Sequence, residues 1–271
     1  MKMGAPASEE AFAALKCSGR VWAVPSIHGE ADRLRAINKA VFDNFDPGDN
    51  LVYLGNMIGR GPAVGETLDE VLLMRRRLMA EKGAEPRNIV FLRGGQEEMW
   101  QKLLTIQFAA DPKNVLDWMV DHGIESTLQA YGASASEGLK AAEEGIMGLT
   151  HWTNELRARL RKRDGHTALL SALKRAAFLD NQALLFVNTG VDFSKSLAEQ
   201  DDTFWWGAGD FDAIEEPYGG FGLIVRGYDS KNRGVRFGPY TATLDSLCGR
   251  GGALEAVCFS ADGTIQERFE A

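Results

Sequence analysis

Residues 51–62, with the sequence LVYLGNMIGRGP, combine a short apolar run with a glycine-rich loop. The apolar residues at 51–54 are typical of a buried strand, Gly55 ends that strand, and residues 64–80 show the apolar spacing of a helix. The same order of strand, loop and helix occurs directly before and after this stretch, at residues 20–45 and 88–108. Three such units in succession predict an α/β fold whose loops gather at the carboxyl ends of parallel strands.

The remaining parts of the chain differ from these three units. Residues 112–179 have a mostly helical, charge-rich pattern and are expected to form a helical cap or insertion. Residues 1–18 are expected to be a flexible N-terminal segment, with one or two helical turns near residues 9–15, and the fold is expected to start near Arg20. We find no linker or repeat and predict a single domain over residues 19–271. A largely antiparallel sheet is expected in the last third, with strands at 183–187, 222–225, 235–237, 241–244, 254–259 and 264–268.

The composition is that of a globular protein, since 45% of the 271 residues are hydrophobic and 25% are charged. Acidic residues outnumber basic ones by 38 to 30, and this net charge of −8 argues against a nucleic-acid partner or an anionic membrane surface. No apolar run approaches the roughly 20 residues that a membrane span requires. Three widely spaced cysteines favour a reducing compartment, and we expect the protein to be cytoplasmic.

Three loops carry short motifs at the predicted carboxyl ends of strands: SIHG at residues 26–29, GNMIGRGP at 55–62 and RGGQE at 93–97. In order and spacing they resemble the signatures D-x-H-G, G-D-x-x-D-R-G-P and R-G-N-H-E of the calcineurin-like metallophosphoesterases. The likeness is greatest to the branch that contains protein serine/threonine phosphatases and symmetrical diadenosine tetraphosphate hydrolases. Further fragments at residues 186–191, 225–228 and 244–254 extend the resemblance over about residues 20–260.

This resemblance implies both a fold and a chemistry. The fold is a four-layer α/β sandwich, in which two central mixed sheets are flanked by helices and carry a helical insertion. The chemistry is phosphoester hydrolysis by two divalent metal ions, such as Mn or Fe, which clamp the phosphate and activate a bridging water. By correspondence, the metal-ligand positions are Ser26, His28, Asn56, Gly95, Asn188 and Tyr228, and only His28 keeps the residue type of the family.

The substitutions remove the chemistry that the resemblance implies. Asn56 replaces the carboxylate that bridges both metals, and Gly95 has no side chain. Gln96 stands in the place of the general-acid histidine, and Gly59 in the place of the aspartate that orients it. We therefore expect no bound metal, no other cofactor and no catalytic residue. The other histidines, His122, His151 and His166, fall in the helical insertion and show no metal-ligand spacing.

Two arginines in the same loops are candidates for holding an anion, because planar guanidinium groups bind phosphate through paired hydrogen bonds. Arg60 matches a family arginine that contacts phosphate, whereas a structural role is favoured for Arg93. For both, a structural ion pair, for example with Glu97 or Glu66, is the alternative. Aromatic residues at 204–206 are expected in the core or at the rim of the pocket. The expected ligand-binding set is His28, Asn56, Arg60, Arg93, Asn188 and Tyr228, and the two asparagines are also expected to hydrogen-bond each other.

The sequence favours a pseudophosphatase, which keeps the scaffold and binds a protein partner or a phosphorylated ligand without hydrolysing it. Two alternatives stay open. The first is a serine/threonine phosphatase-like phosphoesterase with residual or rerouted activity, in which His28 and Gln96 act with one metal or with none. The second is a purely structural interaction protein whose former site has collapsed.

Overall fold

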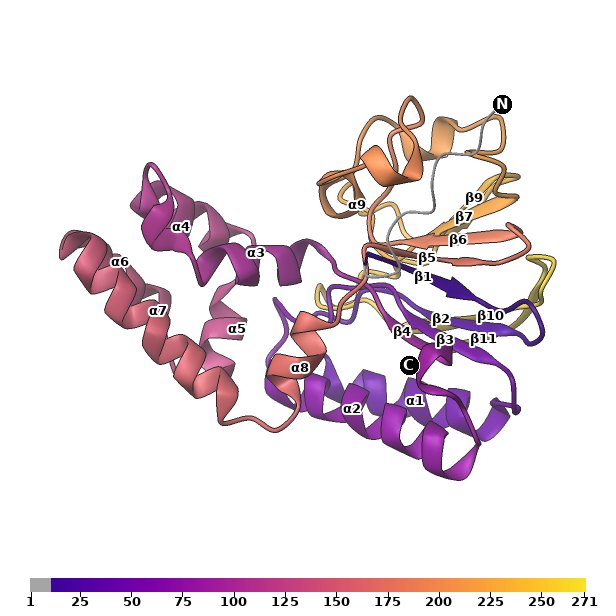
Figure 1. Ribbon diagram of the computed structural model, residues 1–271, viewed down its shortest axis with the longest axis horizontal. Coiled ribbons are helices and arrows are strands. Elements are labelled where there is room, and N and C mark those ends of the chain that lie inside the picture. The colour runs from indigo at the N-terminus through magenta and orange to yellow at the C-terminus, as the bar shows by residue number, and fades with distance from the viewer. Residues whose placement is uncertain (1–10) are drawn as a thin grey trace.

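The computed structural model describes residues 11–271 as two mixed β-sheets packed face to face, with helices outside them (Figure 1). The strand order is β1-β5-β6-β7-β9-β8 in the six-stranded sheet and β11-β10-β2-β3-β4 in the five-stranded sheet. The predicted fold class, an α/β sandwich with two central mixed sheets, is confirmed. The strands are β1 (Phe12–Leu15), β2 (Val21–Val24), β3 (Asn50–Tyr53), β4 (Ile89–Phe91), β5 (Ala176–Leu179), β6 (Leu184–Val187), β7 (Leu223–Arg226), β8 (Arg236–Phe237), β9 (Thr241–Thr243), β10 (Glu255–Phe259) and β11 (Ile265–Glu270).

The predicted strand and helix units build most of the five-stranded sheet. Strands β2, β3 and β4 are parallel neighbours, and α1 (Ala31–Asn44) and α2 (Val64–Glu81) cover the outer face of the sheet (Figure 1). The face of α1 that carries Leu34, Ile37 and Val41 is buried, as its apolar spacing predicts. Because these strands are parallel, the loops that follow them meet at one edge of the sheet.

The strand directions in the six-stranded sheet differ from the sequence prediction. The prediction of a largely antiparallel sheet after residue 183 is wrong for β6, β7 and β9, because β6 pairs in parallel with β7, and β7 with β9. It holds for β8 with β9 and, in the other sheet, for β10 with β11. The connections at residues 188–222 and 227–240 are long enough to return the chain to the same end of the sheet before the next strand begins. Their Gly, Asn and Asp residues look like hairpin turns in the sequence, and such residues carry no information on strand direction.

The N-terminal part also differs from the prediction. Strand β1 (Phe12–Leu15) pairs in parallel with β5, so the prediction of a flexible segment that extends to residue 18 is wrong for these residues. The helical turns predicted near residues 9–15 are wrong from residue 11 onward, and residues 1–10 lie outside the described part of the chain. Phe12 and Leu15 are buried, and their pairing with a distant strand outweighs the helical propensity of the two alanines between them.

A helical arm projects from the sandwich (Figure 1). It corresponds to the predicted insertion at residues 112–179, but helices end at residue 171, and residues 176–179 form β5 instead. A short helix, α9, and irregular chain lie over the outer face of the six-stranded sheet (Figure 1). The remaining α-helices are α3 (Gly95–Leu103), α4 (Pro112–Asp121), α5 (Glu125–Ala130), α6 (Ala135–Glu143), α7 (Gly145–Arg161), α8 (His166–Ser171) and α9 (Thr203–Trp206). Single 3-10 turns occur at Pro86–Asn88, Ile106–Phe108, Leu197–Glu199 and Phe211–Ala213.

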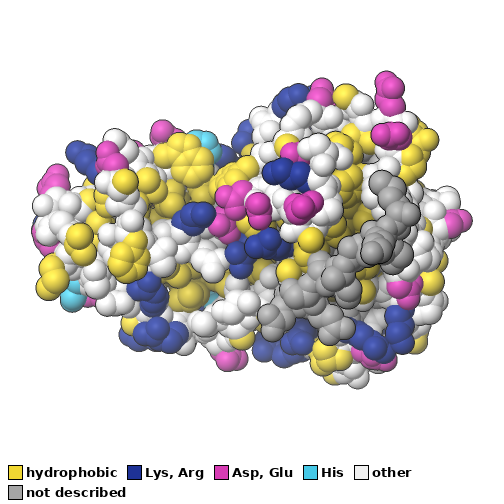
Figure 2. All heavy atoms as spheres, turned by 45° about the horizontal axis from the view of Figure 1, so that its top comes forward, with side chains coloured by type: hydrophobic (Ala, Val, Ile, Leu, Met, Phe, Trp, Pro, Cys, Tyr) yellow, Lys and Arg dark blue, Asp and Glu magenta, His cyan; other side chains and the backbone are white. Residues whose placement is uncertain are grey.

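The core between the two sheets is formed by fully buried side chains from both, including Val52, Phe186 and Val257. A second apolar cluster continues from the α1 and α2 layer into the arm, where Trp100 and Leu156 belong to it. On the face seen in Figure 2, basic and acidic side chains are mixed, and no charge of one sign dominates. Within residues 11–271, no helix is both long and apolar enough to cross a membrane.

Candidate functional site

The loops that follow the parallel strands converge on a cavity of about 200 Å³ at one edge of the sandwich. The loops after β2 and β3 contribute His28, Asn56 and Arg60, and the start of α3 contributes Gly95 and Gln96. The loop after β7 adds Tyr228, and the arm closes the other side through α4. The lining residues are His28, Asn56, Arg60, Gly95, Gln96, Met99, Trp118, His122, Thr189, Trp205, Trp206, Tyr228 and Ser230.

Asn56 lines this cavity and hydrogen-bonds Asn188, as the sequence predicts, but Asn188 itself is buried behind Asn56 and is not a lining residue. Asn56 donates from Nδ2 to Ser26 Oγ at 3.1 Å and to Asn188 Oδ1 at 3.5 Å, and its Oδ1 accepts from the Gln96 backbone N–H at 2.9 Å. Asn188 in turn donates from Nδ2 to the Leu54 carbonyl at 2.7 Å. Three of the residues predicted to share a site, Ser26, Asn56 and Asn188, are thus joined in one buried polar network.

Glu97 holds the loop after β3 in place. Its two carboxylate oxygens accept hydrogen bonds at 2.7–3.2 Å from the backbone N–H groups of Asn56, Met57, Ile58 and Gly94. Burial raises the pKa of Glu97, and the hydrogen bonds from the backbone of Ile58, Gly94 and Asn56 oppose that effect. Both carboxylate oxygens are therefore occupied by backbone N–H groups. These hydrogen bonds hold the loop at Asn56, whose φ is 52°.

Arg93 does not line this cavity, so the prediction that groups it with the other ligand-binding residues is not reproduced here. Its suggested pairing with Glu97 is also wrong, because Glu97 binds backbone N–H groups instead. Arg93 forms an ion pair with Glu98 at 3.1 Å and lies over the ring of Trp205 at 5.8 Å. The structural alternative for Arg93 is therefore the one that the contacts support.

His28 is buried in the cavity wall and is held in its neutral form. It is 2% exposed, and its Nδ1 has no hydrogen-bond partner within residues 11–271. Burial, followed by the positive charges of Arg60 and Arg250, lowers its pKa to about 3. At neutral pH, His28 therefore contributes no positive charge and no readily released proton.

Arg60 supplies the positive charge of the cavity. It makes no side-chain hydrogen bond or ion pair with any residue in the described chain, and its Nε is buried without a partner. Within residues 11–271, Arg60 thus forms no ion pair with Glu66, which was the suggested structural alternative. Burial and the neighbouring Arg250 lower the pKa of Arg60, yet no carboxylate lines the cavity to offset either charge. An anion placed here would meet an unpaired guanidinium group.

The two positions that correspond to the catalytic acid and its orienting partner are structurally coupled. Gly59 has a φ of 104°, and a Cβ atom there would lie 2.4 Å from Gln96 Oε1. Gln96 donates from Nε2 to the His122 carbonyl at 2.8 Å, which ties the start of α3 to the end of α4. Gln96 has no titratable proton near neutral pH, and its side chain occupies the space that a larger residue at position 59 would need.

Aromatic side chains form the rim. Trp118 stacks on His122 at 4.1 Å and meets Trp206 edge-on at 5.7 Å, which brings α4 of the arm against the α9 region. Residues 204–206 were expected in the core or at the rim, whereas nothing in the local sequence pattern pointed to Trp118 or His122. Trp118 is 43% exposed on the amphipathic helix α4. A large apolar side chain in such a position is the feature that could have pointed to a binding surface.

The fold is shown by comparison with solved structures. No protein-family model and no curated protein sequence matches the chain. Among solved structures, one described as a candidate diadenosine tetraphosphatase is similar over 97% of this chain and 98% of its own, with a TM-score of 0.61 and 18% identity. A protein serine/threonine phosphatase from Saccharomyces cerevisiae, described as similar to human phosphatase PP5, is similar over 96% of this chain and 84% of its own, with a TM-score of 0.52 and 15% identity.

The chain has the calcineurin-like phosphoesterase fold. The sequence resemblance is confirmed at the level of the fold, and identities of 15–18% carry no statement about activity.

The donor set does not fit the two divalent metal ions that this phosphoesterase fold implies. Each hard divalent cation requires several anionic oxygen or imidazole ligands. Here the side-chain amides of Asn56 and Asn188 hydrogen-bond each other and backbone groups, and Gly95 has no side chain. Within residues 11–271, no group of three or more His, Cys, Asp or Glu side chains is arranged to hold a metal.

Proposed function

We propose that this protein is a catalytically inactive phosphoesterase-fold protein that binds a phosphorylated ligand in the cavity lined by His28, Arg60 and Tyr228. The ligand is a small phosphorylated molecule or a phosphorylated side chain of a protein partner. The observation that carries the proposal is the replacement of the metal-ligand set by a closed amide network around Asn56, beside an unpaired Arg60.

Two features support binding rather than hydrolysis. The neutral amide of Asn56 cannot offset the repulsion between two divalent cations, and neither Gln96 nor the neutral His28 is suited to protonate a leaving group near pH 7. Arg60, in contrast, offers a charge-assisted hydrogen bond in a cavity that contains no competing carboxylate.

The three cysteines form no disulfide, which supports the further proposal of a reducing, cytoplasmic location.

The first experiment tests for catalysis. The protein is purified after growth in medium supplemented with manganese and iron, and metal content and turnover of an aryl phosphate are measured. We expect well under one metal equivalent per chain and no turnover above that of buffer with the same metal. One or more equivalents of metal that His28→Asn abolishes, together with turnover, would contradict the proposal and support the residual phosphoesterase.

The second experiment tests for anion binding through thermal unfolding in phosphate and in sodium chloride at matched ionic strength. For a Kd of about 1 mM, 10 mM phosphate would add about 1.4 kcal/mol to the free energy of unfolding, which corresponds to a Tm increase of roughly 3 °C. Arg60→Ala should remove this increase. The matched control, Arg35→Ala, removes an exposed arginine of α1 that pairs with Asp32 and should keep it. No phosphate-specific increase in the wild type would favour the collapsed-site alternative.

A further inference from the structure

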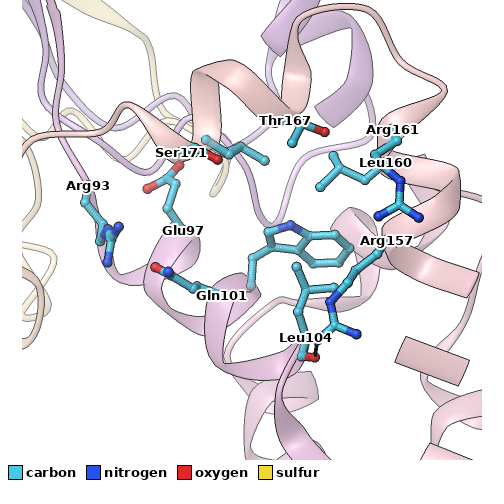
Figure 3. A pocket seen from close by; sticks show the side chains of 11 residues that line it. Arg93, Glu97, Gln101, Leu104, Arg157, Leu160, Arg161, Thr167 and Ser171 are labelled. Atoms are coloured by element: carbon cyan, nitrogen blue, oxygen red, sulfur yellow. Dashed lines mark hydrogen bonds between the residues drawn. The ribbon is translucent and has the colours of Figure 1, made fainter. Parts of the chain in front are cut away.

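A second cavity, of about 330 Å³, lies within the helical arm between α3, α7 and α8 (Figure 3). It is on a different face of α3 from the first cavity. Gln96 and Met99 line the first, whereas Trp100, Gln101 and Leu104 line the second. The two cavities therefore share a helix but none of their lining residues.

Two arginines that lack acidic partners line this second cavity. Arg157 and Arg161 lie one turn apart on α7, and Figure 3 shows them near each other on the same side of the cavity. Arg157 donates to Asn154 Oδ1 at 3.0 Å and to the Leu104 carbonyl, both of which are neutral. Arg161 makes no hydrogen bond or ion pair with any residue of the described chain. Like charges at this spacing repel each other, and an anion between them would relieve the repulsion.

The third arginine of α7, Arg159, differs from these two in having an acidic partner. Arg159, which does not line the cavity, pairs with Glu155 at 3.7 Å. Glu97 is the only carboxylate among the lining residues, but its oxygens already accept four backbone N–H groups and are not available to Arg157 or Arg161. The positive charge in this wall is thus unmatched by the protein itself.

Another part of the cavity wall is apolar, and it indicates that a ligand would have an apolar part beside its charged group. Trp100 is 2% exposed, stacks on Tyr131 at 5.2 Å, and its Nε1 has no hydrogen-bond acceptor within residues 11–271. Leu104, Leu160 and Leu170 supply apolar surface beside it. A flat or aliphatic group is suited to this part of the cavity, because apolar surface is removed from water there.

We propose that this cavity is a binding site for a small organic anion, whose charged group lies between Arg157 and Arg161 and whose apolar part lies against Trp100. Thr167 and Ser171 on α8 also line the cavity, and Figure 3 shows Ser171 beside Glu97, on the side away from the two arginines. This proposal concerns the arm alone and does not depend on what binds in the first cavity.

The experiment uses phenylphosphonate as a non-hydrolysable probe and follows the indole N–H signals of ¹⁵N-tryptophan-labelled full-length protein by NMR. Trp100 reports on the second cavity, whereas Trp118, Trp205 and Trp206 report on the first. We expect a saturable shift of the Trp100 signal, assigned by Trp100→Phe. Arg161→Gln should weaken this response about ten-fold, since a charge-assisted hydrogen bond is lost.

Controls separate this site from the first cavity and from general charge effects. Arg159→Gln, on the same helix but outside the cavity, should leave the Trp100 titration unchanged, and so should Arg60→Ala. Inorganic phosphate alone and benzyl alcohol alone should each bind at least ten-fold more weakly than phenylphosphonate. A Trp100 signal that does not shift, or that shifts equally in Arg161→Gln, would overturn the proposal, and so would inorganic phosphate that binds as tightly as the probe.

Discussion

Asp229 is the central carboxylate of a charge cluster beside the candidate site, and its neutralisation should destabilise the fold strongly. Its side chain is 1% exposed and accepts hydrogen bonds from Arg233 Nε at 2.9 Å and from Arg236 Nη2 at 3.0 Å. Arg226 Nη2 lies 3.2 Å away. Burial alone would raise the pKa of Asp229, but the hydrogen bonds from Arg233 and Arg236 and the charge of Arg226 hold it far below its usual range.

The substitution Asp229→Asn keeps the shape of the side chain and removes its charge. Arg226, which is 4% exposed, would then retain only Asp212, at 3.7 Å, as an acidic partner. Removal of one partner from a buried ion pair costs about 3–5 kcal/mol, because the other charge stays buried without compensation. Since Asp212 compensates part of it, we expect the free energy of unfolding to fall by about 3 kcal/mol, at the lower end of that range.

Urea unfolding at neutral pH, followed by tryptophan fluorescence and circular dichroism, measures this change. Asp210→Asn is the matched control, because Asp210 belongs to the same cluster but its side chain is 48% exposed, with Arg233 at 3.5 Å and Lys231 at 3.6 Å. Exposed pairs contribute about 0–1 kcal/mol, so the control should change stability by less than about 1 kcal/mol. Equal losses in the two variants, or a loss below about 1 kcal/mol in Asp229→Asn, would refute the reasoning from burial.

Two further predictions concern the loops of the site. Gly59→Ala should lower the free energy of unfolding by about 3 kcal/mol, through strain at positive φ and contact with Gln96. Gly83→Ala, at a φ of 70° with open space around it, should lower it by only about 1–2 kcal/mol in the same urea assay, because strain alone acts there. His28 binds a proton near pH 6.5 when unfolded but only near pH 3 when folded. The folded state therefore loses stability as the pH falls through that interval, by roughly 3 kcal/mol at pH 4.5. Comparison of wild type with His28→Asn at pH 7 and pH 4.5 measures that loss, and parallel pH profiles for these two proteins would contradict it, whereas His151→Asn, at an exposed position of α7, should behave as wild type.

The sequence predicted those parts of the fold that depend on local pattern. Short apolar runs, each followed by a loop that contains glycine, located β2, β3 and β4, and their parallel order placed Ser26, Asn56 and the start of α3 at one edge. The same reasoning could not find β1, because Phe12–Leu15 is recognisable as a strand only through its pairing with β5, far along the chain. Nor could it give the direction of β7 and β9, which depends on how the long connections cross the sheet.

The candidate site was predicted mainly where its residues lie in strand-end loops, together with Trp205 and Trp206, which were expected in the core or at the rim. Trp118 and His122 reach the cavity because the arm folds back onto α9, and this contact between distant helices leaves no trace in local periodicity. Arg93 was misassigned for the opposite reason. Its position in the sequence motif suggested the site, but its ion pair with Glu98 and its contact with Trp205 turn it away from the cavity.

The retained loop residues and the retained Arg60 carry different weight as evidence for function. Gly55 has a φ of 86°, and a Cβ atom there would lie 2.6 Å from the Gly94 backbone nitrogen, so the backbone geometry alone requires glycine. Glu97 is likewise required by the N–H groups that it binds. These residues would persist in any stable version of the fold, with or without catalysis. Arg60 has no such structural role for its charge, because an unpaired, half-buried guanidinium group with a lowered pKa is costly to the folded state. A ligand with negative charge is the compensation that the cavity lacks, and this is why the proposed function depends on Arg60 rather than on the better-preserved glycines.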